Sequence, residues 1–261
     1  YMFKETEGRR ERDMDRFGIP EEDWERLQSE HVQWQEDLRG LDVIPLWKKG
    51  TPGFKREYGQ EEPKLCIIPS EDQKKGTVLV CAGGGFHMKS VFEGRVVAEK
   101  YASHGFQAAV LDYRCMPYSI WEMLDDVQRA VRILRLRGKK RIALCGFSAG
   151  GHLAAMAATL YRNANLYEGD EADQIKETPP FFMWMTGEDE VIHKEDFFEM
   201  AEALDRVKVP CELHLFPRGI HGIGLADGSS KFGKADQHSA RWLELSCEWL
   251  ENTGFDQREE F

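Results

Sequence analysis

The chain contains no long apolar segment. Apolar residues make up 41% of its 261 residues, but no stretch approaches the roughly 20 consecutive apolar residues that a membrane-spanning helix needs. Residues 1–16 are dense in Lys, Arg, Glu and Asp, and they lack the apolar core and small-residue cleavage site of a secretory signal. We therefore expect a soluble protein in the cytoplasm, with no membrane as a partner.

Positive charge is in deficit, and cysteine is sparse and scattered. The chain has 35 Lys and Arg against 46 Asp and Glu, so that its formal net charge is −11. Binding to nucleic acid phosphates depends on clustered Lys and Arg, and nucleic acid is therefore not an expected partner. The six cysteines show no CxxC spacing, and we expect neither a disulfide framework nor a zinc site.

Short apolar runs alternate with longer amphipathic stretches along most of the chain, a pattern typical of βαβ units. Most of the apolar runs are apolar enough to be buried on both faces of a mostly parallel sheet. They predict strands at residues 65–68, 77–81, 107–112, 141–145, 181–185 and 212–216. The amphipathic stretches predict helices at residues 93–103, 120–137, 149–161, 194–207 and 235–251. The predicted fold class is therefore α/β, with a central sheet flanked by helices.

A serine lies between a predicted strand and a predicted helix. Residues 146–150 read GFSAG, which is the context of a nucleophile elbow, where small neighbours let the backbone turn sharply around the serine. The helix that begins at Ala149 points N–H groups and the positive end of its dipole at a developing oxyanion. We therefore predict Ser148 as a nucleophile.

Three glycines follow the predicted strand at 77–81. Glycine leaves backbone N–H groups unobstructed, and we predict that Gly84, Gly85 and Ala149 donate hydrogen bonds to the oxyanion. A plain glycine-rich loop and a phosphate cradle are the alternatives. Because neither GK[ST] nor GxGxxG spacing is present, the nucleotide alternative is not favoured.

A serine hydroxyl needs a base to take its proton and a third group to orient that base. Of eight histidines, His221 lies in a loop directly after the predicted strand at 212–216, where an open α/β sheet places its active groups. We predict His221 as the base. His87 and His152 are expected near the site in packing or hydrogen-bonding roles. The other histidines are expected to be surface or structural residues: His31, His104, His193, His214 and His238.

Three consecutive carboxylates follow the predicted strand at 181–185. Asp189 is our prediction for the acid. Glu188 is its first rival and Glu190 the second, since the sequence does not say which side chain points at the histidine. The chain order of serine, acid and histidine is that of α/β-hydrolases and differs from the chymotrypsin and subtilisin orders.

These motifs together resemble the bacterial α/β-hydrolases that include acetyl-xylan esterases, feruloyl esterases and related carbohydrate esterases. The resemblance runs over most of the chain, at residues 46–53, 83–86, 111–114, 117–118, 146–154, 189–191 and 216–225. It implies an α/β-hydrolase fold with Ser148 as nucleophile, Asp189 rather than Glu188 as acid, and His221 as base. It also implies a short acyl group, acetyl above all, on a plant xylan fragment, with no metal or organic cofactor.

Two features depart from that family. Residues 153–180 hold about one helix and a loop, whereas family members insert a further strand, a helix and a cap-like segment before the acid-bearing strand. A parallel crossover needs a dozen or more residues, so we expect one sheet strand and the cap segment to be missing here. His193 stands where such proteins usually have proline.

The N-terminal part differs in composition from the rest of the chain. A charged helical stretch at 21–38 carries Trp24 and Trp34. We interpret residues 1–60 as an arm packed on the core, and residues 61–261 as the catalytic domain. The helix is either a solvated surface element or has a role in a homodimer or in lining the substrate cleft.

The predicted activity is hydrolysis of short-chain carboxylic esters on xylan-derived oligosaccharides through an acyl-enzyme. Two alternatives stay open: a serine peptidase or amidase on the same triad, and a non-catalytic binding protein on a hydrolase scaffold.

Overall fold

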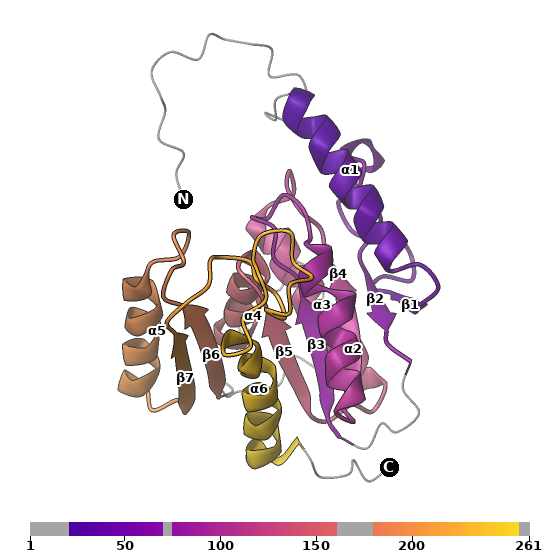
Figure 1. Ribbon diagram of the computed structural model, residues 1–261. Helices are drawn as coiled ribbons and strands as arrows, with labels where there is room; N and C mark the ends of the chain where they lie inside the picture. Colours follow the sequence, from indigo (N-terminus) through magenta and orange to yellow (C-terminus); the bar gives the residue numbers. More distant parts are fainter. Residues whose placement is uncertain (1–20, 70–74, 161–179, 256–261) are drawn as a thin grey trace.

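The computed structural model describes residues 21–69, 75–160 and 180–255, whose arrangement is shown in Figure 1. Within these residues five strands form one sheet in the order β1-β2-β4-β3-β5, and two more form a separate pair. The strands of the larger sheet are β1 (Asp42–Pro45), β2 (Lys64–Ile67), β3 (Thr77–Cys81), β4 (Gln107–Asp112) and β5 (Ile142–Gly146). The pair consists of β6 (Phe181–Thr186) and β7 (Cys211–Phe216). Strands β4, β3 and β5 are parallel, as are β6 and β7, whereas β1 and β2 add an antiparallel edge.

Helices cover both faces of the larger sheet (Figure 1). The described α-helices are α1 (Glu21–Asp37), α2 (Arg95–Ser103), α3 (Ile120–Leu136), α4 (Ala149–Thr159), α5 (Lys194–Arg206) and α6 (Trp242–Leu250). Short 3-10 turns lie at Arg56–Tyr58, Val91–Glu93 and Ser239–Arg241, and a π-helical turn at Glu251–Phe255.

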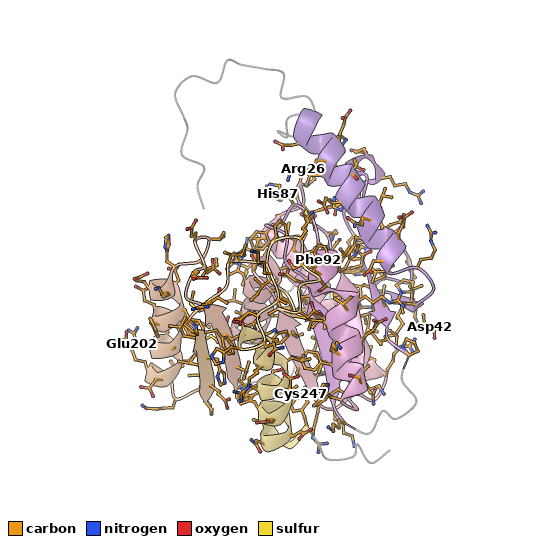
Figure 2. All side chains as sticks on the ribbon, in the orientation of Figure 1. Arg26, Asp42, His87, Phe92, Glu202 and Cys247 are labelled. Atoms are coloured by element: carbon orange, nitrogen blue, oxygen red, sulfur yellow. The ribbon has the colours of Figure 1, made fainter. Side chains whose placement is uncertain are left out.

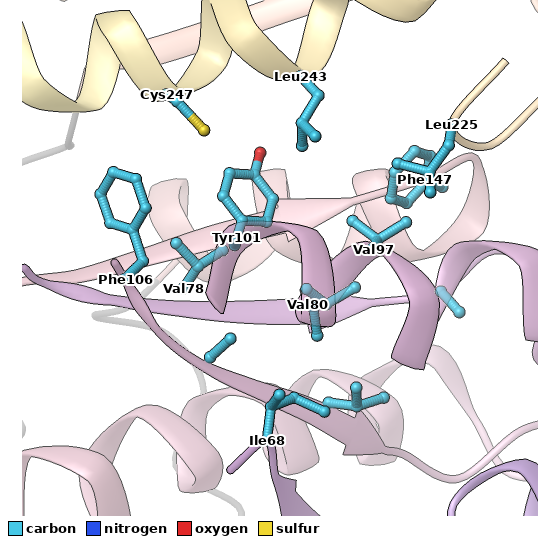
Figure 3. Packing of buried hydrophobic residues seen from close by; sticks show 14 of the residues in the cluster. Ile68, Val78, Val80, Val97, Tyr101, Phe106, Phe147, Leu225, Leu243 and Cys247 are labelled. Atoms are coloured by element: carbon cyan, nitrogen blue, oxygen red, sulfur yellow. The ribbon is translucent and has the colours of Figure 1, made fainter. Parts of the chain in front are cut away.

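Strand β3 divides the core into two layers. Because successive side chains of a strand point to opposite faces, Val78 and Val80 pack in the cluster formed with α2 and α6, part of which is shown in Figure 3. Leu79 and Cys81 pack on the other face with α3 and α4. All five residues of β3 are buried, as expected for an inner strand of a sheet with two covered faces.

The predicted α/β-hydrolase architecture is confirmed, and the six predicted strands begin and end within one residue of the observed ones. Strand β1 was not predicted, since its four residues are mostly exposed and include Pro45, so they show no apolar alternation. Burial on both faces does not hold for three of these strands. Strand β5 is half-buried throughout, the first four residues of β6 are half-buried, and β7 has partly buried and exposed residues before Phe216.

The half-buried state of β5 has a plain cause in the sheet. Strands β5 and β6 are not hydrogen-bonded to each other, although β6 lies beside β5 in Figure 1. A cavity of about 670 Å³ separates them, with all of β5 and all of β6 in its lining. The described residues hold no strand between the two. The predicted loss of one strand and of a cap segment concerns residues 153–180, of which 161–179 lie outside the described part of the chain, and both stay predictions.

Helix α1 is held on the core by buried polar contacts. Trp34, fully buried, donates its indole N–H to Asp112 Oδ1 over 2.9 Å, and the Gln35 amide donates to Asp112 Oδ2 over 2.7 Å. The ammonium of Lys89 lies 2.7 Å from Asp112 Oδ1. His31 is also buried, and burial, together with the nearby charge of Lys89, lowers its pKa to about 4. The proposed division of the chain at residue 60 stays a prediction.

No helix in the described ranges is both long enough and apolar enough to cross a membrane.

Candidate active site

Ser148 lies on a strained turn between β5 and α4. Its φ of 48° and ψ of −118° fall outside the regions that side-chain-bearing residues adopt readily, at a cost of about 1 to 3 kcal/mol. Close backbone packing leaves only glycine at two neighbouring positions. A Cβ on Gly150 would overlap the carbonyl oxygen of Cys81, and a Cβ on Gly146 would overlap that of Gly150. The small residues of the motif therefore let β3, β5 and α4 meet directly behind the serine.

His221 links the serine to a carboxylate. Its Nε2 lies 2.8 Å from Ser148 Oγ, and its Nδ1 lies 2.8 Å from Asp189 Oδ2. An ionised carboxylate only accepts hydrogen bonds, so the ring proton belongs on Nδ1, and Nε2 is left to accept from the serine hydroxyl. This is the tautomer that a general base needs in order to take the serine proton.

The orientation of Asp189 is set by its own loop. The N–H groups of Val191 and Ile192 donate to Oδ1 over 2.8 and 2.9 Å, which leaves Oδ2 for the histidine. The rival Glu188 has a different partner, since its Oε2 accepts from the Gly219 N–H over 2.9 Å. Glu190 is exposed. Of the three consecutive carboxylates, Asp189 is thus the one in contact with His221.

The glycine loop crosses directly over the nucleophile. A Cβ on Gly83 would lie 2.9 Å from Ser148 Cβ, so only glycine fits there. Gly84 and Gly85 have positive φ angles of 137° and 62°, and the Gly84 carbonyl accepts from the N–H groups of His87 and Met88 at 3.1 and 3.2 Å. Gly83 thus packs against the serine, and Ala149 takes the first position of α4. The roles of Gly84, Gly85 and Ala149 as oxyanion donors stay a prediction.

The remaining nearby histidines have the minor roles expected of them. His87 Nδ1 lies 2.8 Å from the carbonyl oxygen of Gly85. His152 forms an edge-on ring contact with Phe86, with centroids 5.7 Å apart. Neither histidine forms a hydrogen bond with Ser148 in the described part of the chain.

A tryptophan joins the two sheets beneath the site. Trp242 stacks on Trp184 of β6, with ring centroids 5.1 Å apart, and meets Phe147 of the elbow edge-on at 5.5 Å. Its indole N–H donates to the Gly224 carbonyl in the histidine loop over 3.0 Å. One buried side chain therefore contacts the strand before the acid, the turn of the nucleophile and the loop of the base.

Sequence reasoning missed Glu93, a buried carboxylate behind the glycine loop. Its Oε2 accepts from the Gly83 N–H over 3.0 Å, and only 4% of the residue is exposed. A glutamate at the start of a predicted helix is ordinary, because it complements the helix dipole. The sequence therefore contains no signal that this residue faces the site.

The cavity between β5 and β6 opens at the triad. Ser148, Asp189 and His221 all line it, so its volume of about 670 Å³ is directly accessible to a molecule bound at the serine. Volumes of this size suit a drug-sized ligand. Among the described residues, no group of three or more His, Cys, Asp or Glu is arranged to hold a metal ion.

Comparisons with known proteins identify relatives of this chain among xylan-degrading enzymes and esterases. The BD-FAE family model matches residues 66–179. Endo-1,4-beta-xylanase B of Butyrivibrio fibrisolvens is 26% identical over 239 residues, covering 70% of this chain and 38% of that protein. Acetylxylan esterase of Xylanibacter ruminicola is 20% identical over 226 residues, covering 69% of this chain and 47% of that protein. The chain thus spans less than half the length of these two curated relatives.

Solved structures give the same answer at the level of the fold. The acetyl ester-xyloside bifunctional hydrolase from Caldicellulosiruptor lactoaceticus superimposes with a TM-score of 0.71 at 28% identity, covering 82% of this chain and 97% of that one. MGS-M1, an α/β hydrolase enzyme from a Medee basin deep-sea metagenome library, gives a TM-score of 0.64 at 24% identity, covering 82% and 97%. The chain therefore has the α/β-hydrolase fold and is similar to bacterial carbohydrate esterases of that fold.

Proposed function

We propose that the chain is a serine carboxylesterase that works through Ser148, His221 and Asp189. The observation that carries the proposal is the continuous chain of hydrogen bonds from Asp189 through both ring nitrogens of His221 to Ser148, each 2.8 Å long. It lies on a nucleophile elbow and lines a cavity large enough for a substrate. Nucleophile, base and orienting acid are the three parts that acyl transfer requires.

In the proposed mechanism, Ser148 Oγ attacks the ester carbonyl while its proton passes to His221 Nε2. The resulting oxyanion accepts hydrogen bonds from the N–H groups of Gly84, Gly85 and Ala149. The imidazolium, stabilised by Asp189, gives its proton to the departing alcohol, which leaves an acyl group on Ser148. Water then attacks with His221 again as base, and the acid is released as the serine regains its proton.

The proposed substrates are short acyl esters, acetyl above all, on xylan-derived oligosaccharides. Two similar proteins support this choice through their names, an acetylxylan esterase and an acetyl ester-xyloside bifunctional hydrolase. A neutral sugar ester also suits a chain of net charge −11, because it is not repelled as an anionic polymer would be. The cavity beside Ser148 is far larger than an acetyl group, so acyl length is the property to measure first.

The test compares the protein with Ser148→Ala on p-nitrophenyl esters of increasing chain length, and measures acetate release from acetylated xylo-oligosaccharides alongside. We expect hydrolysis of the short esters, release of acetate, and loss of both in Ser148→Ala. Activity that rises with acyl length, without acetate release, would contradict the acetyl assignment but leave the esterase. Wild-type protein inactive on every ester, yet active on an aminoacyl amide, would contradict the esterase itself.

A further inference from the structure

Glu93 reaches the active site from the segment that precedes α2. It ends the short turn Val91–Glu93, next to Phe92, which is labelled in Figure 2 at the upper end of α2. Its carboxylate accepts the Gly83 N–H over 3.0 Å, while the Gly83 carbonyl accepts the Ser90 N–H over 2.9 Å. Both backbone polar groups of Gly83 are thus bound by residues 90–93, and this segment sets the position of the glycine loop.

The Glu93 carboxylate and the nucleophile lie against the same glycine. A Cβ built on Gly83 would lie 2.8 Å from Glu93 Oε2 and 2.9 Å from Ser148 Cβ. No larger residue fits between them, so little protein separates the buried charge from the serine and from His221 bound to it. The low polarisability of such a buried region lets charges interact more strongly than they do in water.

A buried carboxylate without a permanent cation calls for an explanation. In the described part of the chain, no lysine or arginine forms an ion pair with Glu93, and its hydrogen bond is to a backbone amide. Burial raises the pKa of the Glu93 carboxyl, while the Gly83 N–H and the positive charge of protonated His221 act in the opposite direction. Burying a charge costs several kcal/mol of desolvation free energy, and the attraction of a well-placed opposite charge is needed to offset that cost. The charge that acts favourably on Glu93 is that of protonated His221, the imidazolium of the proposed acyl transfer.

We propose that Glu93 is a positioning residue of the reaction, which fixes Gly83 at the base of the glycine loop and favours the protonated form of His221 through its negative charge. The inference rests on the proposed triad. Glu93 would be a second carboxylate beside the triad. It contacts the glycine loop, whereas Asp189 contacts the histidine ring.

The other titratable groups around Glu93 do not change charge near neutral pH. Burial raises the pKa of Tyr113 well above its usual value, and its hydroxyl donates to the Ala82 carbonyl. Burial likewise raises the pKa of Cys145 to about 12. These two side chains therefore do not contribute to the acid side of a pH profile.

Two substitutions separate the charge from the position. Glu93→Gln keeps an oxygen for the Gly83 N–H and removes the charge. Because a nearby carboxylate stabilises the imidazolium that forms during acyl transfer, we expect its removal to move the acid limb of kcat/KM to lower pH. Glu93→Asp keeps the charge and withdraws it from Gly83, so we expect about a 10-fold lower kcat at unchanged KM, with the acid limb in place.

The rate at which a fluorophosphonate labels Ser148 is measured against pH together with p-nitrophenyl acetate hydrolysis. Glu99→Gln is the matched control, since Glu99 is exposed on α2 and pairs with Arg95; it should leave both profiles unchanged. If Glu93→Gln and Glu93→Asp both keep the wild-type acid limb and lose rate equally at every pH, the inference is overturned. Labelling needs no ester substrate, so a wild type that is labelled but hydrolyses no ester would refute the proposed function and still allow this test.

Discussion

The buried pair of Lys89 and Asp112 provides a strong test of how the chain is held together. Asp112 is 2% exposed and accepts from Lys89, Trp34 and Gln35. Its substitution by asparagine keeps one acceptor oxygen but removes the negative charge beside the Lys89 ammonium, which is 3% exposed and is left as a buried cation that donates to the Tyr113 carbonyl over 2.6 Å. Breaking a buried ion pair from one side typically costs about 3 to 5 kcal/mol. We expect Asp112→Asn to lose that much free energy of unfolding at pH 7.

The assay is urea unfolding followed by circular dichroism, repeated from pH 7 to pH 3. Burial alone would raise the pKa of Asp112, but the Lys89 charge and its hydrogen bonds outweigh this and lower it. A lowered pKa adds stability that is present above the unfolded value, about 3.9, and is lost as pH falls through the folded value. The difference between wild type and Asp112→Asn should therefore shrink below about pH 4.

Two further variants complete this test. Asp205→Asn breaks the exposed ion pair of Asp205 (77% exposed) with Lys208 (80% exposed). It should change the free energy of unfolding little, because solvent screens such pairs. Adding Lys89→Met to Asp112→Asn removes the stranded charge, and should restore part of the lost stability. The reasoning is refuted if Asp112→Asn costs less than about 1 kcal/mol, the range of a surface pair, or if the double variant is no more stable than the single one.

Two other predictions concern the site. Asp189→Asn should lower kcat for p-nitrophenyl acetate on the order of 1000-fold or more, because an amide no longer enforces the Nδ1–H tautomer. Glu188→Gln should stay far closer to wild type, because Glu188 binds the Gly219 N–H and not the histidine. Equal losses in the two variants would contradict the assignment of the acid. Gly150→Ala should reduce both the melting temperature and the labelling of Ser148, because the added Cβ would overlap the Cys81 carbonyl oxygen. A wild-type melting temperature in calorimetry would show that the elbow relaxes more easily than the packing indicates.

Local patterns in the sequence were enough to predict six of the seven described strands and the nucleophile turn. The short apolar run at 77–81 predicts a buried strand, in which Val78 and Val80 pack on one face of the sheet and Leu79 and Cys81 on the other. The glycines around Ser148 predict the turn because close backbone packing tolerates nothing larger. Each of these signals lies within a few residues of the feature that it predicts.

Features that depend on distant partners were not predicted from the sequence. The half-buried state of β5 follows from the lack of hydrogen bonds to β6, which composition does not reveal. The helix predicted from residue 235 begins instead at Trp242, after a turn in which Asp236 accepts from the Ser239 hydroxyl over 2.6 Å. Glu93 meets Gly83 only because the chain folds back after the glycine loop.

The separation of the two sheets also bears on how the triad keeps its alignment. Ser148 and the glycine loop follow strands of the five-stranded sheet, whereas Asp189 and His221 follow β6 and β7. Backbone hydrogen bonds hold each half rigid, but side-chain packing, with Trp242 at its centre, sets one half against the other. Packing yields to heat and denaturant more readily than a continuous ladder of hydrogen bonds does. We therefore expect heat or denaturant to disturb catalytic alignment first, so that inactivation precedes the loss of secondary structure.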